Sequence, residues 1–176
     1  MIFESEDLYI NPIDHDDIYA VVELYNSNTN FLKNHMDTDA VTPQWVIDEL
    51  ESMKSLGFSS YKAIEKGSKK VIGIIDFKID VETYLSLLMV HRNYTNRGLG
   101  KQIYMAFEEY VILKKSKRIR LDVVNGYSDK VLSFWSGRGF HKSEDISLNW
   151  NGVILPAVTM IKIIEFGKDS SIAGSL

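Results

Sequence analysis

Apolar residues recur every three or four positions in three segments of the chain, the spacing that places them on one face of an α-helix. The first predicted helix begins after Asp14, whose side chain is suited to capping it, and ends near Asn26. The second begins at Pro43, because proline suits the first helical position, and ends before Gly57. The third begins near Gly98.

The remaining apolar segments lack helical spacing and predict β-strands. They are residues 8–12, 60–65, 71–79, 83–90, 119–124, 146–150 and 153–164. Polar and apolar residues alternate little within 83–90, so we expect this strand to be covered on both faces. The strand at 119–124 follows a helix and should lie parallel to the strand before that helix. Asn151-Gly152 predicts a tight type I′ turn between the last two strands.

This order of helices and strands predicts one mixed α/β domain over residues 1–166, followed by a small, polar C-terminal tail at 167–176. The chain has no internal repeat and no linker-like segment. Residues 27–39 are polar and rich in asparagine, which predicts a loop that accommodates a short helical turn. Residues 125–129 cap a short helix that is expected to end near Ser136.

Composition excludes several classes of site. The chain contains no cysteine, which excludes disulfides, thiolate metal ligands and cysteine nucleophiles, and no metal is expected. The formal net charge of −4 disfavours nucleic acid as a partner. The first residues do not resemble a secretory signal, and no apolar run is long enough to cross a bilayer. We therefore expect a cytoplasmic protein without a membrane partner.

Two glycines one residue apart, Gly98 and Gly100, occur where the strand ending at Val90 leads into the third predicted helix. Glycine lets the backbone approach a ligand closely, and the first N–H groups of a helix point outward without partners. The helix dipole adds partial positive charge, and Arg97 and Lys101 add full charges. This segment therefore predicts a site for a phosphate or pyrophosphate group.

Two motifs in this chain resemble those of the GNAT superfamily of acyl-CoA-dependent N-acetyltransferases. Residues 95–100, called the glycine turn below, are similar to the family pattern of Gln or Arg, two residues, Gly, one residue, and Gly or Ala, with Thr95 at the leading position. Residues 132–140 resemble the family's aromatic pair, three spacers and Gly-Phe, downstream of a strand that leads into Asn125. The resemblance extends over residues 8–164.

The resemblance implies an α/β fold with a mixed, mostly antiparallel, twisted sheet and flanking helices. The central parallel strands would splay, and the acyl group would lie between residues 88–90 and 123–125. Acetyl-CoA is implied as the acyl donor. The residues implied to bind it are Met89, Val90, His91, Arg97, Gly98, Leu99, Gly100, Lys101, Asn125, Ser128, Lys130 and Phe134.

Acetyl transfer requires a neutral amine, a polarised thioester carbonyl and a stabilised thiolate. Trp135 stands where the family usually has an acidic tyrosine, and an indole N–H does not deliver a proton, so the Tyr127 hydroxyl is the first candidate acid. Asp76, His35 and Asp122 are the candidate bases. Three of these candidates have a structural alternative: Tyr127 as a turn residue, Asp76 as a solvent-facing strand residue and His35 as a surface loop residue.

We therefore expect an N-acetyltransferase in which a primary amine, on a small molecule or a peptide, attacks acetyl-CoA directly in a ternary complex. The alternative is a non-catalytic, acyl-CoA-binding regulatory module, which the departures at Thr95 and Trp135 favour. A nucleotide-phosphate enzyme is disfavoured, because the glycine turn lacks the Gly-Lys-Ser/Thr ending of a phosphate-binding loop.

The acceptor is expected to enter between residues 27–39, the second helix and the final hairpin. Asp37, Asp39 and Asp80 indicate a positively charged acceptor. The late strands are also suited to pairing across a homodimer.

Overall fold

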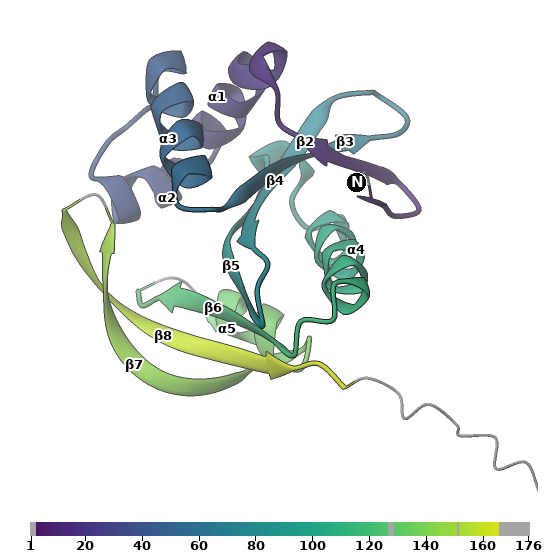
Figure 1. Ribbon diagram of the computed structural model, residues 1–176. Helices are drawn as coiled ribbons and strands as arrows, with labels where there is room; N and C mark the ends of the chain where they lie inside the picture. The colour runs from purple at the N-terminus through teal and green to yellow at the C-terminus, as the bar shows by residue number, and fades with distance from the viewer. Residues whose placement is uncertain (1–2, 127–128, 151, 166–176) are drawn as a thin grey trace, which may run out of the picture.

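The computed structural model describes residues 3–126, 129–150 and 152–165. These residues form an eight-stranded sheet in the order β1-β2-β3-β4-β5-β6-β8-β7 (Figure 1). The β5–β6 pair is parallel, whereas the other neighbouring strands in this order pair antiparallel. The strands are β1 Phe3–Glu4, β2 Leu8–Pro12, β3 Ser59–Glu65, β4 Val71–Lys78, β5 Glu82–Val90, β6 Arg118–Val124, β7 His141–Trp150 and β8 Val153–Ile163.

Helices cover both faces of this sheet. They are α1 Ile18–Ser27, α2 Thr29–Phe31, α3 Pro43–Ser55, α4 Leu99–Leu113 and α5 Asp129–Ser136, with a π-helical turn, η2, at Leu32–Met36 and 3-10 turns at His15–Asp17 and Arg92–Tyr94. Figure 1 shows α1 and α3 on one side of β4 and β5, and α4 on the other. None of the helices in the described ranges is both long and apolar enough to cross a membrane.

The predicted helix starts and the predicted parallel pair are confirmed. The Asp14 side chain accepts a hydrogen bond from the Asp16 N–H, and the Thr42 hydroxyl accepts one from the Trp45 N–H. Gly98 precedes α4 with φ of 78°, a left-handed conformation that glycine adopts without strain. Asn151 and residues 167–176 lie outside the described residues, so the predicted turn and tail stay predictions.

Three differences from the sequence prediction have tertiary causes. Strand β1 was not predicted, and it is held by Phe3, whose ring packs against Tyr61, Phe77 and Tyr110. Strand β7 begins at His141 rather than near residue 146, because pairing with β8 extends it through exposed polar residues. The helical turn expected within the loop at 27–39 extends over residues 29–36, and its Leu32 and His35 side chains are buried.

The core consists of two main clusters on opposite faces of the sheet. Residues of α4, including Ile103 and Phe107, pack with β3, β4 and the first half of β5. Residues of α1 and α3, including Leu24 and Val46, pack with Ile74 and with the second half of β5. The cavity described below opens where β5 passes from one cluster to the other.

A bulge at Ser86 produces this change of face. Phe77 pairs with Leu85, but its neighbour Asp76 pairs with Leu87, so Ser86 is an extra residue on β5. Leu85 therefore packs in the α4 cluster, whereas Leu87 packs in the α1–α3 cluster. Buried and half-buried residues alternate along β5, so both faces are covered, as predicted, although not equally.

Candidate active site

A cavity of about 660 Å³ lies where the two parallel strands separate. The parallel pairing includes Glu82 with Arg118, Thr83 with Ile119 and Tyr84 with Arg120, and the following parts of both strands line the cavity. Its size is typical of a small-molecule site. Residues 84–90 and 121–124 form its middle, residues 94–96 and 98–101 with α5 and Arg138 form one end, and Asn28, Phe31 and His35 with the end of β7 form the other.

The glycine turn brings backbone close to the cavity at the amino end of α4. Gly98 and Gly100 both line it. A Cβ on Gly100 would lie 3.6 Å from a Val90 methyl carbon, 3.8 Å from Leu88 and 3.9 Å from Phe134. The lining includes the cations Lys101, Lys130 and Arg138. This end therefore combines a helix amino terminus with positive side chains, as anion binding requires.

Arg138 was missed by the sequence prediction, because it occupies a spacer position of its motif. Its guanidinium carbon lies 3.4 Å from the centre of the Phe134 ring, and one terminal nitrogen donates to the Phe134 carbonyl. The Nε atom is buried and has no hydrogen-bond partner within the described part of the chain. Burial lowers the pKa of this guanidinium from its usual value. A partly desolvated cation with an unused donor is suited to an anionic ligand.

The structure brings most of the predicted donor-binding residues together. Those that line the cavity are Met89, Val90, Gly98, Leu99, Gly100, Lys101, Lys130 and Phe134. The Arg97 guanidinium instead stacks 5.0 Å from the Tyr94 ring centre, and His91 Nδ1 accepts from the Asn93 N–H. Asn125 is exposed, and its N–H donates to the Pro156 carbonyl. These three side chains do not belong to the lining, and Ser128 lies outside the described residues.

Asn28, also missed from the sequence, joins α1 to the end of β5. Its side-chain nitrogen donates to the Val90 carbonyl at 3.2 Å and to the Leu24 carbonyl at 2.9 Å. The Ser27 hydroxyl accepts from the Arg92 N–H at 3.1 Å. These bonds fix the start of the 28–35 wall against the strand that leads to the glycine turn.

Asp122 lies in the middle of the cavity wall but is saturated with hydrogen bonds. Its carboxylate accepts from the Tyr84 hydroxyl at 2.9 Å, from the Thr159 hydroxyl at 2.7 Å and from the Arg120 guanidinium at 3.3 Å. Burial and the nearby Asp122 charge raise the pKa of Tyr84 well above its usual value. Tyr84 is therefore a poor proton donor, and Asp122 serves to hold β5, β6 and β8 together where the strands separate.

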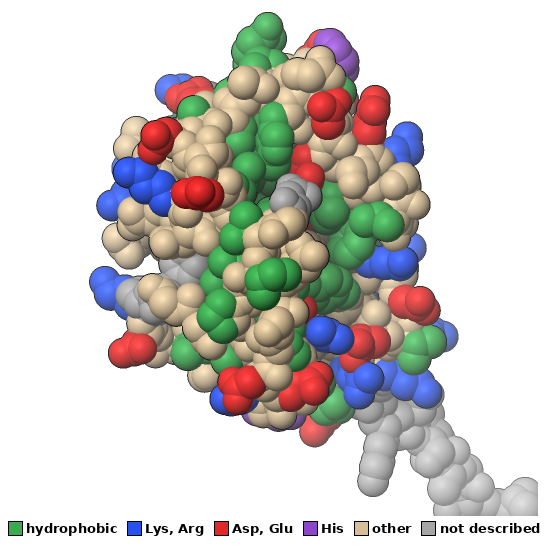
Figure 2. Space-filling model, turned by 90° about the vertical axis from the view of Figure 1, so that its left-hand side faces the viewer, with side chains coloured by type: hydrophobic (Ala, Val, Ile, Leu, Met, Phe, Trp, Pro, Cys, Tyr) green, Lys and Arg blue, Asp and Glu red, His purple; other side chains and the backbone are tan. Residues whose placement is uncertain are grey.

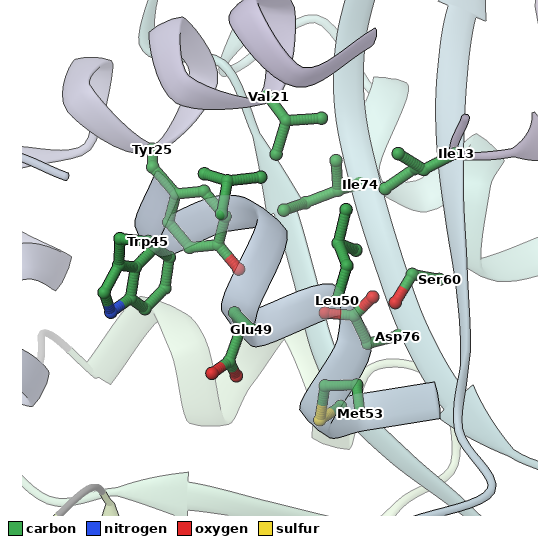
Figure 3. A pocket seen from close by; sticks show the side chains of 11 residues that line it. Ile13, Val21, Tyr25, Trp45, Glu49, Leu50, Met53, Ser60, Ile74 and Asp76 are labelled. Carbon is green, nitrogen blue, oxygen red and sulfur yellow. The ribbon is translucent and has the colours of Figure 1, made fainter. Parts of the chain in front are cut away.

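Asp76, a predicted base, lies in a separate pocket (Figure 3). It is on β4 beneath α3, and Figure 3 shows its carboxyl beside Ser60 and below Leu50. The pocket volume is about 10 Å³, enough for one water molecule. Oδ1 is buried and lacks a partner among the residues described.

Burial raises the pKa of Asp76 to about 7, with a smaller contribution from the Glu49 charge, against a Ser60 hydrogen bond that lowers it. The interpretation of Asp76 as solvent-facing is wrong, since it is 6% exposed. Because Asp76 does not line the large cavity, we do not assign it to proton transfer at the acyl group.

His35 lines the large cavity and is only 8% exposed, so the surface-loop interpretation is wrong. Its ring stacks on Phe31 with centres 4.2 Å apart and meets Trp150 edge-on at 5.5 Å. Burial lowers the pKa of His35 to about 4, although a hydrogen bond with the Phe31 backbone opposes the shift. His35 is therefore an uncharged wall residue at neutral pH.

We expect the His35 imidazole to titrate with a midpoint near pH 4 in the folded protein, because charging it requires transfer of a cation into an apolar wall. The pKa of the unfolded chain is near the ordinary 6.5, so this group makes stability fall as pH decreases from 6.5 towards 4. The measurement is the pH dependence of the His35 ring-proton chemical shifts, assigned with His35→Gln. A midpoint above pH 6 would contradict the buried, uncharged state.

Trp135, which stands at the family's usual acid position, contributes to the core. Its ring meets Tyr104 at 5.5 Å, Phe140 at 5.4 Å and Phe134 at 4.8 Å, each in an edge-on arrangement. It also forms part of the cavity wall. Tyr127, the alternative acid, lies outside the described residues. No group of three or more metal-ligating side chains occurs in the described ranges.

A family model described as the Acetyltransferase (GNAT) family matches residues 18–140. Among solved structures, the chain is similar to an acetyltransferase from Thermus thermophilus, with 18% identity, TM-score 0.74 and coverage of 92% of this chain and 99% of that one. A ribosomal L7/L12 α-N-protein acetyltransferase in complex with coenzyme A has 13% identity, TM-score 0.76 and coverage of 93% and 98%.

Spermidine N-acetyltransferase from Vibrio cholerae, in complex with coenzyme A and spermine, has 13% identity, TM-score 0.71 and coverage of 89% and 95%. At these identities the solved structures establish a shared fold. No curated protein sequence matches the chain.

Proposed function

Because this chain belongs to the GNAT acetyltransferase family, we propose that it transfers the acetyl group of acetyl-CoA to a primary amine in a ternary complex. The observation that carries the proposal is the continuous cavity, with the glycine turn at one end, separated strands in the middle and aromatic side chains at the other end. A donor and an acceptor that enter from opposite ends would meet between β5 and β6. Positioning of this kind supplies a large share of the rate of a two-substrate reaction.

Acetyl-CoA fits the glycine-turn end by shape and charge. The Cα of Gly100 faces Val90, Leu88 and Phe134 without an intervening side chain, which leaves room for a close ligand. Lys101, together with Arg138 and its unused Nε donor, supplies positive charge for phosphate oxygens. The β5–β6 pairing ends at Tyr84 and Arg120, so the later backbone groups of β5 that face β6 are suited to hydrogen bonds with the pantetheine arm.

The reaction requires no covalent enzyme intermediate. The amine nitrogen forms a bond to the thioester carbonyl carbon, the carbon–sulfur bond breaks, and the sulfur leaves as a thiolate that takes up a proton. The Val90 amide, at the separated part of β5, is our candidate to polarise the carbonyl oxygen. His35 is too weakly basic to hold the amine proton at neutral pH, so the acceptor must lose that proton to water or bind in its neutral form.

We retain Tyr127 as the candidate acid for the thiolate, because Tyr84 is bound to Asp122 and Trp135 lacks an acidic proton. Tyr127→Phe is expected to lower kcat by about 10- to 100-fold with little change in the KM for acetyl-CoA. Steady-state kinetics at saturating acceptor measure both constants. A kcat equal to that of the wild type would remove this hydroxyl from the mechanism.

The proposed function is tested by following free-thiol release from acetyl-CoA in the presence of a panel of primary amines, with coenzyme binding measured separately by calorimetry. Acceptor-dependent thiol release, with the acetylated amine identified by mass spectrometry, is the expected result. Coenzyme binding without turnover on every amine would favour the regulatory module, and absence of coenzyme binding would contradict both interpretations.

A further inference from the structure

The end of the cavity remote from the glycine turn is lined by aromatic side chains. Phe31 of α2, His35 of η2 and Trp150 of β7 form it, and we call these three residues the aromatic wall. The Phe31 and Trp150 ring centres are 6.1 Å apart at an interplanar angle of 89°, and His35 contacts both rings. Figure 1 shows the end of the β7–β8 hairpin beside α2, which is how residues distant in the sequence form one surface. Leu148 and Met89 extend the apolar lining.

This end of the cavity carries no formal charge among the described lining residues. The lining carboxylate is Asp122, whose oxygens are occupied by Tyr84, Thr159 and Arg120. The lining cations are Lys101 in the first turn of α4, Lys130 of α5 and Arg138 just after α5, and burial keeps His35 uncharged. An acceptor with several positive charges would lose its hydration here without gaining a counter-ion, which is costly.

The three acidic residues that suggested a cationic acceptor lie elsewhere. Asp37 and Asp39 are exposed, and Asp39 pairs with Lys33 at 3.7 Å. Asp80 lies in the β4–β5 turn, where its carboxylate accepts from the Val81 N–H. None of the three lines the cavity, so they place no negative charge inside this site, and the positively charged acceptor stays a prediction.

Acidic side chains do occur on the surface around the site. Figure 2 shows a band of hydrophobic side chains down the face that carries the end of the hairpin, with Asp and Glu side chains interspersed with Lys and Arg at its margins. The margins therefore carry charges of both signs, whereas the interior that they surround is apolar.

One polar atom in the wall indicates a further feature of the ligand. The indole nitrogen of Trp150 is buried and has no hydrogen-bond partner in the described ranges. An indole N–H is a donor only, and buried donors are nearly always paired in native proteins. A ligand oxygen would satisfy this donor once the indole turns far enough to expose the N–H to the cavity.

We propose that the acceptor is a primary amine on an uncharged aromatic frame that also carries a hydrogen-bond-accepting oxygen. This rests on the proposed acetyltransferase function. The ring packs against Phe31 and Trp150, the oxygen accepts from the Trp150 indole N–H, and the amine extends towards the gap between β5 and β6. The nitrogen bonds to the acetyl carbon, the carbon–sulfur bond breaks, and the proton lost by nitrogen balances the one gained by sulfur. A primary amine attached to an oxygen-bearing aromatic ring occurs both in free arylalkylamines and in peptides with an amino-terminal aromatic residue.

The test compares kcat/KM of the full chain for amines that differ in one feature. Tyramine has both ring and oxygen, phenylethylamine lacks the oxygen, butylamine lacks the ring, and spermidine adds charge. We expect kcat/KM for tyramine to exceed that for butylamine and spermidine by at least about 10-fold, because these amines lack the buried ring contacts. It should exceed that for phenylethylamine by about 3- to 10-fold, the effect of one hydrogen bond. A tetrapeptide with amino-terminal tyrosine distinguishes a peptide source from a free amine.

Trp150→Phe removes the N–H and keeps an aromatic ring. It is expected to raise the KM for tyramine about 5- to 10-fold and the KM for phenylethylamine by clearly less, since phenylethylamine loses only part of the ring contact, and to leave the Kd for acetyl-CoA unchanged. Trp45→Phe is the matched control, because Trp45 lies at the small Asp76 pocket and not in the large cavity. It should change none of these constants.

The outcomes separate the two proposals. Turnover of spermidine or butylamine with equal or greater kcat/KM than tyramine would overturn the aromatic acceptor and leave the acetyltransferase function in place. An equal loss for tyramine and phenylethylamine in Trp150→Phe would overturn the role of the oxygen. Thiol release with none of the amines or the peptide, despite coenzyme binding, would overturn the function itself.

Discussion

Gly100→Glu is expected to weaken acetyl-CoA binding by at least about 100-fold while the protein still folds. A side chain at this position would point towards Val90, Leu88 and Phe134, which are in the cavity wall. The carboxylate would occupy the space that the donor phosphates need and would repel them. A loss of 100-fold corresponds to about 2.7 kcal/mol, within the range of a steric and charge conflict at one position.

Gly100 is a better test than Gly98. A Cβ at Gly100 would meet its neighbours at ordinary contact distances, so the fold tolerates a side chain there. Gly98 has φ of 78°, and a substitution there adds backbone strain to any effect on binding. In a Gly98 variant, a loss of acetyl-CoA binding could therefore not be distinguished from a loss of folding stability.

Gly67→Glu is the matched control for Gly100→Glu. It makes the same change of charge in the β3–β4 turn, where a new Cβ meets nothing within 4 Å and the cavity is not contacted. Isothermal titration calorimetry gives the Kd for acetyl-CoA, and urea unfolding gives the free energy of unfolding. Wild-type affinity in Gly100→Glu would place the donor at another site.

Asp76→Asn is expected to raise the free energy of unfolding by about 2 kcal/mol at pH 8 and by little at pH 4. The carboxyl has a pKa of about 7 in the folded protein and an ordinary value of 3.8 when exposed. Between these values the folded state binds a proton that the unfolded state has lost, so stability falls as pH rises from about 4 to 7. A pKa shift of this size corresponds to a change of at most about 4 kcal/mol in the free energy of unfolding, and relaxation of the structure around the carboxylate reduces this change.

The mechanism of this penalty is the burial of an unpaired charge. Asp76 lies among Tyr25, Ile74 and Leu50, and the acidic side chain of Glu49 lines the same pocket (Figure 3). Asparagine keeps an oxygen for the Ser60 hydrogen bond and removes the ionisable group.

Asp48→Asn on the exposed side of α3 is the control for Asp76→Asn, because it changes the same functional group without burial. Unfolding in urea at pH 4, 6 and 8 measures the difference for each variant. A stability difference that does not grow with pH would contradict a raised pKa at Asp76.

Local sequence patterns predicted the elements that local physics determines. Asp14 and Thr42 cap their helices with short-range hydrogen bonds, and Gly98 adopts the left-handed conformation that the absence of a side chain permits. The glycine turn was recognisable for the same reason, since its function depends on backbone and on a helix terminus. Eight of the implied donor-binding residues line the cavity, and they lie on β5, at the glycine turn and start of α4, and on α5.

Residues whose positions depend on contacts between distant segments were misjudged. His35 was interpreted as a surface residue because its neighbours are polar, yet Phe31 and Trp150 enclose it. Arg138 and Trp150 gave no signal, because each occupies a spacer or strand position that tolerates many residue types. Each has a buried side-chain nitrogen without a hydrogen-bond partner in the described ranges, and this property arises only when the chain folds.

By itself, the sequence determined the family motifs, the order of helices and strands, and the end of the cavity suited to an acyl-CoA donor. Only the tertiary structure decided which side chains face the acceptor. The bulge at Ser86 changes the face to which Leu87 and Met89 point, and the hairpin end brings Trp150 to Phe31. A turn and a helix terminus are properties of neighbouring residues, whereas a pocket wall is a property of segments that meet through sheet register and packing.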